Sequence, residues 1–591
     1  MAFQDINTFV NALRERRQLI EITEAVDPRL EIAEIHRRVI ERGGPALLFS
    51  RVKGSEFPVV TNLFGTKERV DLAFGDEGRK IVAEVAKLPH ELLPPTLPKL
   101  WSKRSLFAKL ARVGIKRDQL AKVTYGLDIP PDLEKLPIIT SWPMDGGPFV
   151  TLPLVYTEDP ETGISNLGMY RMQRFSKETT GMHMQIGKGG GFHLSRAGEL
   201  GKALPLNVFI GGPPAAIIAA IAPLPENVPE LLLASLLLKK KLRLAKNPAG
   251  PLPLLADAEF ALVGSVDPNE RQPEGPFGDH YGYYSLTHDF PVFRCKAVFH
   301  RKNAIYPATV VGKPRQEDYY IGNYLQELLS PLFPVVMPAV RDLWSYGETG
   351  YHSLAAAVVR ERYKREAMVS AFRILGEGQL SLTKFLLLVD RPMDLHDFPK
   401  VLEYVLERAD FRSDLYVFSH LAMDTLDYTG PKLNEGSKGV LLGMGEPIRS
   451  LPREFQGQLP TGFSEARVFC GGCLVVSGPS YASDKDAASA LAAHASVKEW
   501  PLVVLADDAH AATSSAAYFL WSTFTRFEPA ADIVSSKQRV TRFHVELDYP
   551  IVIDARMKPN YPDELFCDDE TSALVDRRWN EYAQGALQRI C

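Results

Sequence analysis

The chain has 591 residues, which at ordinary domain sizes corresponds to about three or four domains. Hydrophobic residues make up 45% of it and charged residues 24%, a balance typical of globular proteins that argues against long disordered regions. The 68 basic and 72 acidic residues give a net charge of −4, without the basic excess of a dedicated nucleic-acid-binding protein.

The cysteine content, the N-terminal pattern and the longest uncharged stretch indicate the cellular compartment. Five cysteines cannot form a disulfide scaffold and fit a reducing environment. Residues 1–19 have the pattern of an amphipathic helix and lack the apolar core and cleavage site of a signal peptide. The longest uncharged stretch, 204–225, is interrupted by Gly211-Gly212-Pro213-Pro214, which indicates a strand, a turn and a buried helix. We therefore expect a cytoplasmic protein.

Residues 1–90 alternate between helix and strand signals. Ile32, Ile35 and Val39 fall on one face of a helix that Gly43-Gly44-Pro45 ends, and the segments 46–50 and 58–62 have the composition of strands. This pattern predicts an α/β domain at the start of the chain.

Two basic runs follow. Residues 91–123 are rich in proline and then in basic residues, and Lys239–Lys241, Arg243 and Lys246 form a second run. Solvated surface segments are the plain interpretation of both. The alternative is an anionic partner or a peripheral contact with the inner face of a membrane. The basic residues of the first run are Lys103, Arg104, Lys109, Arg112, Lys116 and Arg117.

Short strand-like runs, punctuated by glycine and proline, fill the region from Leu136 to Val311. They are TLPLVY, MHMQI, LNVFI, FALVGSV and FRCKAVFHR, and their regular spacing predicts a barrel or a sandwich. After Tyr319 the helix and strand alternation returns. KFLLLVD predicts a buried strand, a helix follows from Phe398, and DLYVFS predicts the next strand of a parallel sheet.

A weak internal similarity marks the last third of the chain. LVVLADD, with Asp507, precedes FTRFEPAADIVSS, much as KFLLLVD, with Asp390, precedes LERADFRSDLYVFS. Either a duplicated half-unit or the shared pattern of α/β segments explains this similarity. Residues 573–587 predict an amphipathic helix that packs on its own domain or on a neighbouring subunit.

Two of three clusters in the central region combine polar groups with glycine. In Asn166-Leu-Gly-Met-Tyr-Arg171 the amide oxygen suits a hard cation and the arginine suits a carboxylate or phosphate. In His183-Met-Gln-Ile-Gly-Lys188-Gly-Gly-Gly191 the glycines let backbone N–H groups approach phosphate oxygens, and Lys188 adds a charge. A hairpin with a surface arginine and an ordinary loop are the respective alternatives.

The third cluster is Pro273-Glu274-Gly-Pro-Phe-Gly-Asp279-His-Tyr-Gly-Tyr-Tyr284. It holds two carboxylates in a loop stiffened by proline and flanked by aromatic residues. When two carboxylates lie close together and partly desolvated, their pKa values separate, so that one can stay protonated as an acid. A tight turn with solvated acids is the alternative.

In this order, the three clusters resemble the UbiD family of decarboxylases, which use prenylated flavin mononucleotide (prenylated FMN). The most specific segments are N-x-G-x-Y-R, the glycine loop, and PEGPFGDHYGYY followed by IYPATVVGKPRQED. The resemblance runs from the start to about Gly443 and resumes from Pro550 to the C-terminal helix. It implies an N-terminal α/β domain (1–125), a central FMN-binding split β-barrel with the active site (126–318), and a C-terminal α/β oligomerisation domain (319–591) ending in a dimerisation helix. Residues 445–545 form an unmatched insertion.

The same resemblance implies roles for individual residues. Arg171, Glu274 and Asp279 match the catalytic arginine–acid–acid network, with Asp279 as the expected proton donor. Asn166 and Glu230 match ligands of Mn²⁺, or another divalent cation, that bridges to the cofactor phosphate; K⁺ is a further ion that the pattern allows. The flavin-contacting positions are Met169, Tyr170, Arg171, His183, Met184, Gln185, Lys188 and Gly189.

Two positions depart from the family pattern. Lys188 stands where many members have arginine, which keeps the charge but loses the two-pronged geometry. Gly189 stands where some members have a third metal-ligating histidine, so His193 or water would complete the shell.

The implied activity is non-oxidative decarboxylation of an aromatic or α,β-unsaturated acid. The substrate expected first is a 4-hydroxy-3-polyprenylbenzoate of ubiquinone biosynthesis. The alternative is a naphthoate of menaquinone biosynthesis or another aromatic acid. The implied partners are a flavin prenyltransferase that supplies the cofactor and further copies of the chain, in a homodimer or homohexamer. A plain FMN-binding redox protein and a non-catalytic assembly partner remain open. Cys470-Gly-Gly-Cys473 lacks the second pair of a zinc site and indicates a buried turn.

Overall fold

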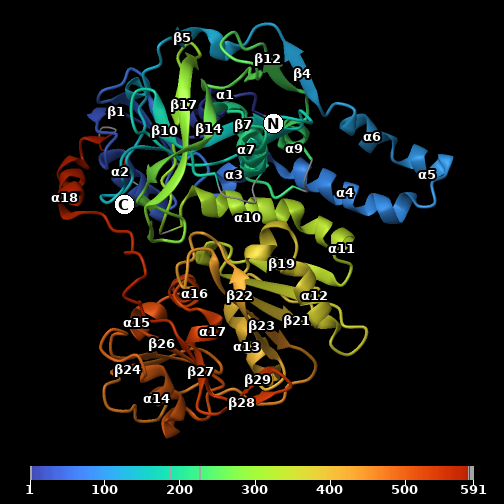
Figure 1. The fold of residues 1–591 in the computed structure, drawn as a ribbon, viewed down its shortest axis with the longest axis vertical. Coiled ribbons are helices and arrows are strands. Elements are labelled where there is room, and N and C mark those ends of the chain that lie inside the picture. Colours follow the sequence, from blue (N-terminus) through green and yellow to red (C-terminus); the bar gives the residue numbers. More distant parts are fainter. Residues whose placement is uncertain are drawn as a thin grey trace. The chain divides into compact units, whose positions relative to one another are not determined.

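The structure is a computed structural model that describes residues 3–184, 189–224, 228–313, 315–582, 585 and 587. Contacts divide the chain into two units, Met1–Leu328 with Asp563–Cys591, and Leu329–Pro562. Figure 1 labels their elements. The bounds of the three predicted domains stay predictions, and the end of the chain, Asp563–Cys591, belongs with the first unit.

The N-terminal elements follow the predicted α/β pattern. Helices α1 (Ile6–Glu15) and α2 (Glu31–Glu41) accompany strands β1 (Leu19–Val26), β2 (Ala46–Val52) and β3 (Val59–Thr61). The apolar face of α2, with Ile32, Ile35 and Val39, is fully buried, which is what stabilises an amphipathic helix on a sheet. The sheet order is β1-β2-β3-β18, so β18 (Tyr306–Pro307) comes from far along the chain.

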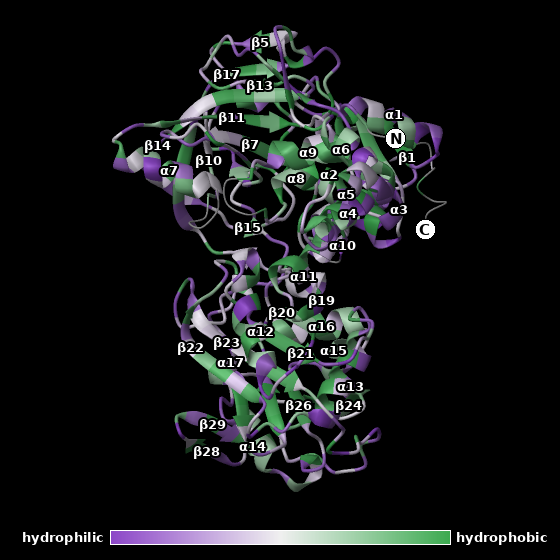
Figure 2. Ribbon diagram, turned by 90° about the vertical axis from the view of Figure 1, so that its right-hand side faces the viewer, coloured by the Kyte–Doolittle hydropathy of each residue, from purple (hydrophilic) through white to green (hydrophobic). Residues whose placement is uncertain are grey.

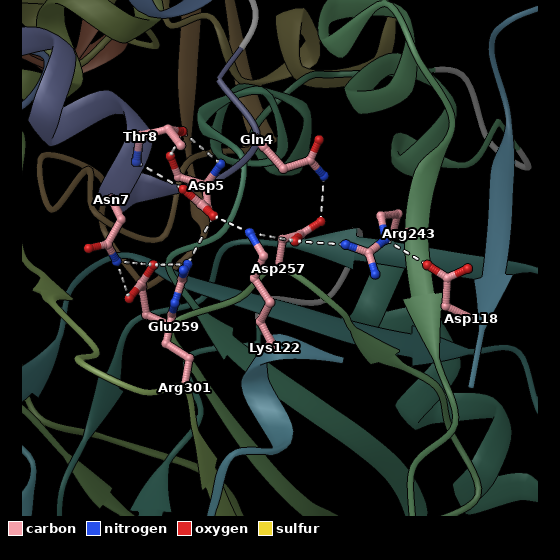
Figure 3. A network of polar contacts seen from close by, with 10 residues as sticks. All are labelled: Gln4, Asp5, Asn7, Thr8, Asp118, Lys122, Arg243, Asp257, Glu259 and Arg301. Atoms are coloured by element: carbon pink, nitrogen blue, oxygen red, sulfur yellow. Dashed lines mark hydrogen bonds and ion pairs between the residues drawn. The ribbon is translucent and has the colours of Figure 1, made fainter. Parts of the chain in front are cut away.

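A network of buried charges holds the N-terminus in place (Figure 3). Asp5 caps α1 by accepting a hydrogen bond from the Thr8 backbone N–H at 2.9 Å. Its carboxylate also lies 2.9 Å from Lys122 Nζ and 3.0 Å from Arg301 Nη1. Arg301 in turn contacts Glu259 at 2.9 Å. Because Asp5 and Glu259 are buried, each carboxylate depends on these partners.

The central region forms an antiparallel sheet of order β10-β17-β14-β11-β7-β8. Four of the five predicted strand segments are confirmed, since TLPLVY, LNVFI, FALVGSV and FRCKAVFHR fall in strands. These strands are β7 (Pro153–Glu158), β11 (Leu204–Ile210), β14 (Phe260–Glu274) and β17 (His288–His300), with β8 (Ser165–Gly168), β10 (Thr179–Gly181) and β5 (Gly126–Asp128, paired to β17). Helix α8 (Pro214–Ala220) follows β11 as predicted. No pairing of β8 with β10 closes this path within the described ranges, so the split barrel stays a prediction.

The strand predicted for MHMQI is wrong over its described residues, Met182–Met184. Here the backbone leaves the regular ladder, because the Met182 N–H donates to the Pro291 carbonyl at 2.9 Å and the His183 N–H donates to the Arg171 carbonyl at 3.1 Å. Gln185 and Ile186 lie outside the described residues.

The second unit contains two five-stranded sheets whose connected strands have the same order and directions. The first has the order β19-β20-β21-β23-β22 and the second β24-β25-β26-β30-β27. In each, three parallel strands are flanked by two antiparallel ones. Figure 2 shows the inner strands β21 and β26 as strongly hydrophobic. The strands are β19 (Val340–Ser345), β20 (Leu354–Val359), β21 (Phe385–Val389), β22 (Leu415–Ala422), β23 (Glu435–Gly443), β24 (Glu465–Cys470), β25 (Cys473–Ser477), β26 (Leu502–Ala506), β27 (Ile533–Ser535) and β30 (Ile551–Asp554).

Matching hydrogen bonds support a duplicated half-unit over a shared α/β pattern. Asp390 Oδ2, after β21, accepts from the Gly445 N–H at 2.8 Å, and Asp507 Oδ2, after β26, accepts from the Met557 N–H at 2.9 Å. Both bonds tie the end of one parallel strand to the turn after its neighbour. Four of the five strands of the second sheet, β24, β25, β26 and β27, come from the segment 445–545, which was predicted as an unmatched insertion.

One prediction for this unit is corrected. DLYVFS forms β22 after helix α13 (Phe398–Arg408), as expected, but β22 is not a parallel neighbour of β21. Strand β23 lies between them and pairs antiparallel to β22. The alternation of strand and helix predicted the elements but not which strand would occupy the place beside β21.

The terminal helix α18 (Asp569–Arg578) packs on α2 of the same chain. Arg38 Nη1 lies 2.5 Å from Asp576 Oδ1, and the Tyr582 hydroxyl donates to Glu31 Oε1 at 2.7 Å. The helix begins four residues before the predicted range 573–587 and ends at Arg578. A role in dimerisation stays a prediction.

Two smaller expectations concern the cysteine pair and membrane spans. Cys470 and Cys473 face each other across the β24–β25 hairpin as buried free thiols, which confirms the buried turn. No helix in the described ranges combines the length and the apolar composition needed to cross a bilayer.

Candidate active site

The third sequence cluster folds into a tight hairpin of β15 (Phe277–Gly278) and β16 (Tyr284–Ser285), with Asp279 directly after β15. The Gly282 N–H donates to the Asp279 carbonyl at 2.9 Å, and Gly282 takes a φ of 84°, which favours glycine. A Cβ on Gly278 would lie 2.1 Å from the Trp142 ring. Glycine is therefore needed both to turn the hairpin and to let Trp142 pack against it.

Arg171 binds both predicted acids with different nitrogens. Its Nε donates to Glu274 Oε1 at 3.0 Å, its Nη1 donates to Asp279 Oδ2, and its Nη2 donates to Ser285 Oγ at 3.0 Å. The guanidinium carbon lies 4.7 Å from the centroid of the Phe277 ring. The predicted convergence of Arg171, Glu274 and Asp279 is thus confirmed as geometry, whereas their catalytic roles stay a proposal.

The charge state of the two acids differs from the sequence-based expectation. Burial acts to raise the pKa of Glu274, but Arg171 and His183 bring it below its usual value. Burial likewise opposes ionisation of Asp279, but Arg171 and His280 hold its pKa well below its usual range. The expectation that one of the two acids stays protonated is therefore wrong for this arrangement. Arg171 lies between the acids and favours the ionised form of both.

Two further side chains fix this network. His183 Nδ1 lies 2.8 Å from Glu274 Oε2, and the His183 ring lies 4.1 Å from the Phe290 ring. Burial lowers the pKa of His183, so we assign a neutral ring whose Nδ1–H donates to the ionised Glu274. Ser285, which we did not predict, accepts from Arg171 and, at 3.2 Å, from the Phe277 N–H. Its only sequence signal is its position directly after the PEGPFGDHYGYY cluster.

Two more acids near the hairpin were also missed. Asp145 Oδ1 accepts from the Gly278 N–H at 2.8 Å, and its Oδ2 accepts from the Trp142 N–H at 2.9 Å, which ties a neighbouring loop to the hairpin. Burial raises the pKa of Asp318 to about 6, while the nearby charge of His280 acts to lower it. Asp318 is therefore an acid beside the Asp279–His280 pair that can carry a proton near neutral pH.

The C-terminal segment of the first unit packs against the same hairpin. The Tyr284 N–H donates to the Asp563 carbonyl at 2.9 Å, and the Leu565 N–H donates to the Gly282 carbonyl at 3.0 Å. Glu564 between them forms an ion pair with Lys313. These contacts join residues that are far apart in the chain, so no local sequence pattern predicts them.

The predicted phosphate and metal residues lie around the start of helix α7 (Gly189–Glu199). A Cβ on Gly189 would lie 2.0 Å from Asn166 Oδ1, and the Gly190 N–H donates to the Tyr170 hydroxyl at 3.0 Å. Glu230, the first residue of α9 (Glu230–Leu238), accepts from the Leu167 N–H at 2.9 Å, and burial raises its pKa. A glycine cradle at a helix start suits a phosphate, and the oxygens of Asn166 and Glu230 suit a hard cation.

No group of three or more His, Cys, Asp or Glu side chains that could hold a metal occurs in the part of the chain that the structure describes. His193, considered as a substitute, has its Nδ1 2.9 Å from Thr157 Oγ1. Of the predicted flavin-contacting residues, Tyr170, His183 and Met184 are buried, Met169 is half-buried, and Gln185 and Lys188 lie outside the described residues.

Three family models match the chain. They describe the N-terminal domain (residues 10–88), the Rift-related domain (116–314) and the C-terminal domain (319–443) of 3-octaprenyl-4-hydroxybenzoate carboxy-lyase. A relative from Chlamydia pneumoniae, named as one subunit of a 4-hydroxybenzoate decarboxylase, is 51% identical over 573 residues, covering 97% of each chain.

Solved structures show the same fold at lower identity. The closed form of vanillic acid decarboxylase from Sedimentibacter hydroxybenzoicus has a TM-score of 0.68 at 23% identity, covering 78% of this chain and 96% of that one. The UbiD-class enzyme HmfF from Pelotomaculum thermopropionicum, in complex with FMN, has a TM-score of 0.62 at 23% identity, covering 77% and 97%. The family models and the extent of the similarity establish that this chain belongs to the UbiD family of carboxy-lyases.

Proposed function

We propose that the chain removes CO₂ from an aromatic carboxylic acid without net oxidation, using prenylated FMN. The observation that carries this proposal is the buried arrangement in which Arg171 binds Glu274 and Asp279 together. A plain flavin redox protein has no need of such an arrangement. Relatives with FMN and with prenylated FMN bound support the choice of cofactor.

The cofactor, when bound, supplies an electron sink for the carbon that loses CO₂. Asn166, Tyr170 and the first N–H groups of α7 would hold its phosphate. Asn166 and Glu230 would hold a divalent cation such as Mn²⁺, with water and phosphate in the remaining positions.

Arg171 would orient the substrate carboxylate, because a guanidinium presents several donors in a fixed plane. Glu274, bound by both Arg171 and His183, would hold that guanidinium in place. Asp279 would deliver the proton that replaces CO₂. Since its low pKa keeps it ionised at rest, it must first gain that proton. His280, with Nδ1 2.5 Å from Asp279 Oδ1, and the neighbouring Asp318 are the groups placed to supply it.

We propose that the substrate is a 4-hydroxybenzoate. Within this class, the first candidate is a 4-hydroxy-3-polyprenylbenzoate of ubiquinone biosynthesis. The descriptions of the family models and the name of the chlamydial relative both specify a 4-hydroxybenzoate, which favours this class over a naphthoate of menaquinone biosynthesis. A flavin prenyltransferase would supply the cofactor, and a homodimer or homohexamer is the expected assembly.

The test combines cofactor identity with CO₂ release. The full chain is co-expressed with a flavin prenyltransferase, the mass of its bound cofactor is measured, and 4-hydroxybenzoate, a 3-prenyl derivative, a hydroxynaphthoate and cinnamate are assayed. We expect prenylated FMN and CO₂ release from the hydroxybenzoates, with Glu274→Gln and Asp279→Asn inactive but still holding flavin. Unmodified FMN with redox turnover would indicate a flavin redox protein, and absence of flavin an assembly partner. Near-normal turnover of either variant would refute the assigned roles.

A further inference from the structure

A basic arm, residues 93–117, extends from the first unit. It contains helices α5 (Leu97–Ser102) and α6 (Arg104–Leu110), follows α4 (Asp76–Leu92), and ends in β4 (Ile115–Asp118). Figure 1 shows α5 at the outer end of α4, and α6 between α5 and β4. Most of the arm falls between the stretches matched by the N-terminal and central family models, 10–88 and 116–314, so those models do not account for it.

The arm exposes large apolar side chains. Helix α5 has no buried residue, and Leu97 and Trp101 are 82% and 70% exposed. Together with Leu100 they follow the spacing that places side chains on one helical face. Contiguous exposed apolar side chains of this size mark an interaction surface rather than ordinary solvent exposure.

The arm is also strongly cationic. Residues 93–117 contain seven lysines and arginines and no acidic residue, in a chain of net charge −4. Lys103, Lys109 and Lys116 pair with nearby carboxylates. Lys99, Arg104, Arg112 and Arg117 form no ion pair with a carboxylate in the described part of the chain.

The two basic runs of the sequence meet at the root of the arm. Strand β12 (Leu242–Ala245) pairs parallel to β4, with Arg243 opposite Lys116. This pairing brings the exposed Lys240 and Lys241 next to the arm, and within the described ranges neither forms an ion pair. The pairing therefore extends the unbalanced positive charge around the root of the exposed apolar helix.

We propose that the basic arm docks on an anionic phospholipid surface. Leu97, Leu100 and Trp101 would enter the headgroup region, where tryptophan is favoured, and the surrounding cations would contact lipid phosphates. A second copy of the chain fits this surface less well, because pairing the arm with itself would bring uncompensated positive charges together. The proposal is independent of the substrate, since it concerns binding to lipid alone.

The test is co-sedimentation of the full chain with phosphatidylcholine vesicles, with and without one quarter phosphatidylglycerol, at low and high salt. We expect binding only to the anionic vesicles, and weaker binding at high salt. At about 1 kcal/mol per basic residue, reversal of three charges in Lys99→Glu/Arg104→Glu/Arg112→Glu should weaken binding by about a hundredfold or more.

Two further variants separate the apolar face from net charge. Leu97→Ser/Trp101→Ser should weaken binding roughly tenfold or more at unchanged charge. The matched control Lys364→Glu/Lys432→Glu/Lys498→Glu reverses three exposed lysines of the second unit and should bind like the wild type.

The results of these measurements distinguish the occupants of the surface. Loss of vesicle binding in the arm variants, with unchanged molar mass by light scattering, would support the proposal. Wild-type binding that is absent, or equal on neutral vesicles, would overturn it. A fall in molar mass of the arm variants without vesicle binding by the wild type would also overturn it, and would assign the arm to contacts between copies.

Discussion

Arg171 Nε lies 3.0 Å from Glu274 Oε1, although 103 positions separate the two residues in the chain. Arg171 follows β8, and Glu274 ends β14. The same guanidinium also reaches Asp279 on the β15–β16 hairpin. One buried side chain thereby joins two elements of the first unit and keeps both acids ionised, and this relationship is the basis of the proposed chemistry.

Arg171→Lys should lower kcat/KM for CO₂ release by about a hundredfold to a thousandfold, because a lysine keeps the charge but cannot bind both acids and Ser285 in one plane. The flavin content, read from the absorption spectrum, should stay near that of the wild type. Arg196 lies on α7 and forms an exposed ion pair with Glu161. Arg196→Lys is therefore the matched control and should be fully active. More than half of wild-type activity in Arg171→Lys would contradict the role of the guanidinium.

Ser285→Ala should remove an acceptor shared by Arg171 Nη2 and the Phe277 N–H. A buried donor left without a partner costs about 1–3 kcal/mol. If the loss of this acceptor lets the Arg171 guanidinium leave its present orientation, kcat should fall about fivefold to a hundredfold while KM changes little. Steady-state kinetics on variants of equal flavin content measure this, and an unchanged kcat would show that Ser285 does not position the guanidinium.

The pH profile tests Asp318 as the source of the proton. Burial raises its pKa to about 6, so the protonated form is lost as the pH rises through that value, and kcat should fall with it. Asp318→Asn should lower kcat and remove this part of the profile. A variant that keeps the wild-type profile would assign the ionisation to another group.

Gly189→Ala should displace Asn166, because the added Cβ would lie 2.0 Å from Asn166 Oδ1. Flavin affinity and bound metal, measured by fluorescence titration and elemental analysis, should both fall. Gly198→Ala, near the end of the same helix, places its Cβ 3.2 Å from Pro268 and serves as control. Equal flavin and metal content in the two variants would exclude Asn166 as a ligand.

Asp5→Asn should destabilise the first unit by about 2–3 kcal/mol, because it removes a buried charge bound by Lys122 and Arg301. Asp5→Ala should cost about 1 kcal/mol more, since asparagine still caps α1 and alanine does not. Urea midpoints of the first unfolding transition measure both.

The pH dependence of this effect has a defined sign. Burial acts to raise the pKa of Asp5, but Lys122, the Thr8 N–H and Arg301 outweigh it and bring this pKa below its ordinary value of 3.8. The unfolded chain therefore binds the proton more tightly, so the stabilisation is complete above about pH 4 and is lost as the pH falls. The difference between wild type and Asp5→Asn should shrink below that pH, and a constant difference would contradict the ion pair.

Local patterns in the sequence predicted most elements, because amphipathic spacing and glycine or proline breaks are local properties. They predicted α2, β11 and α8, and the similarity around Asp390 and Asp507 raised a duplicated half-unit as one of two explanations. The place of β22 beside β23 could not be predicted, since strand order depends on contacts far apart in the chain. The same limit explains why the end of the chain was not expected to pack on the β15–β16 hairpin.

In the candidate site too, local motifs could be predicted and long-range contacts could not. The motifs identified Arg171, Glu274 and Asp279. Asp318 ends the quoted segment IYPATVVGKPRQED and Ser285 directly follows PEGPFGDHYGYY, but neither was assigned a role until their neighbours in the structure were known. The expected separation of the two acid pKa values failed because it considered the carboxylates alone. The position of Arg171 between them became visible only in three dimensions.

The most direct test of the central claim is decarboxylation in D₂O by the chain loaded with prenylated FMN. For the hydroxybenzoate that it accepts, the wild type should release CO₂ and place one deuterium on the carbon that carried the carboxyl group, while Glu274→Gln with equal flavin should do neither. Deuterated product from Glu274→Gln at a rate near that of the wild type would contradict the account.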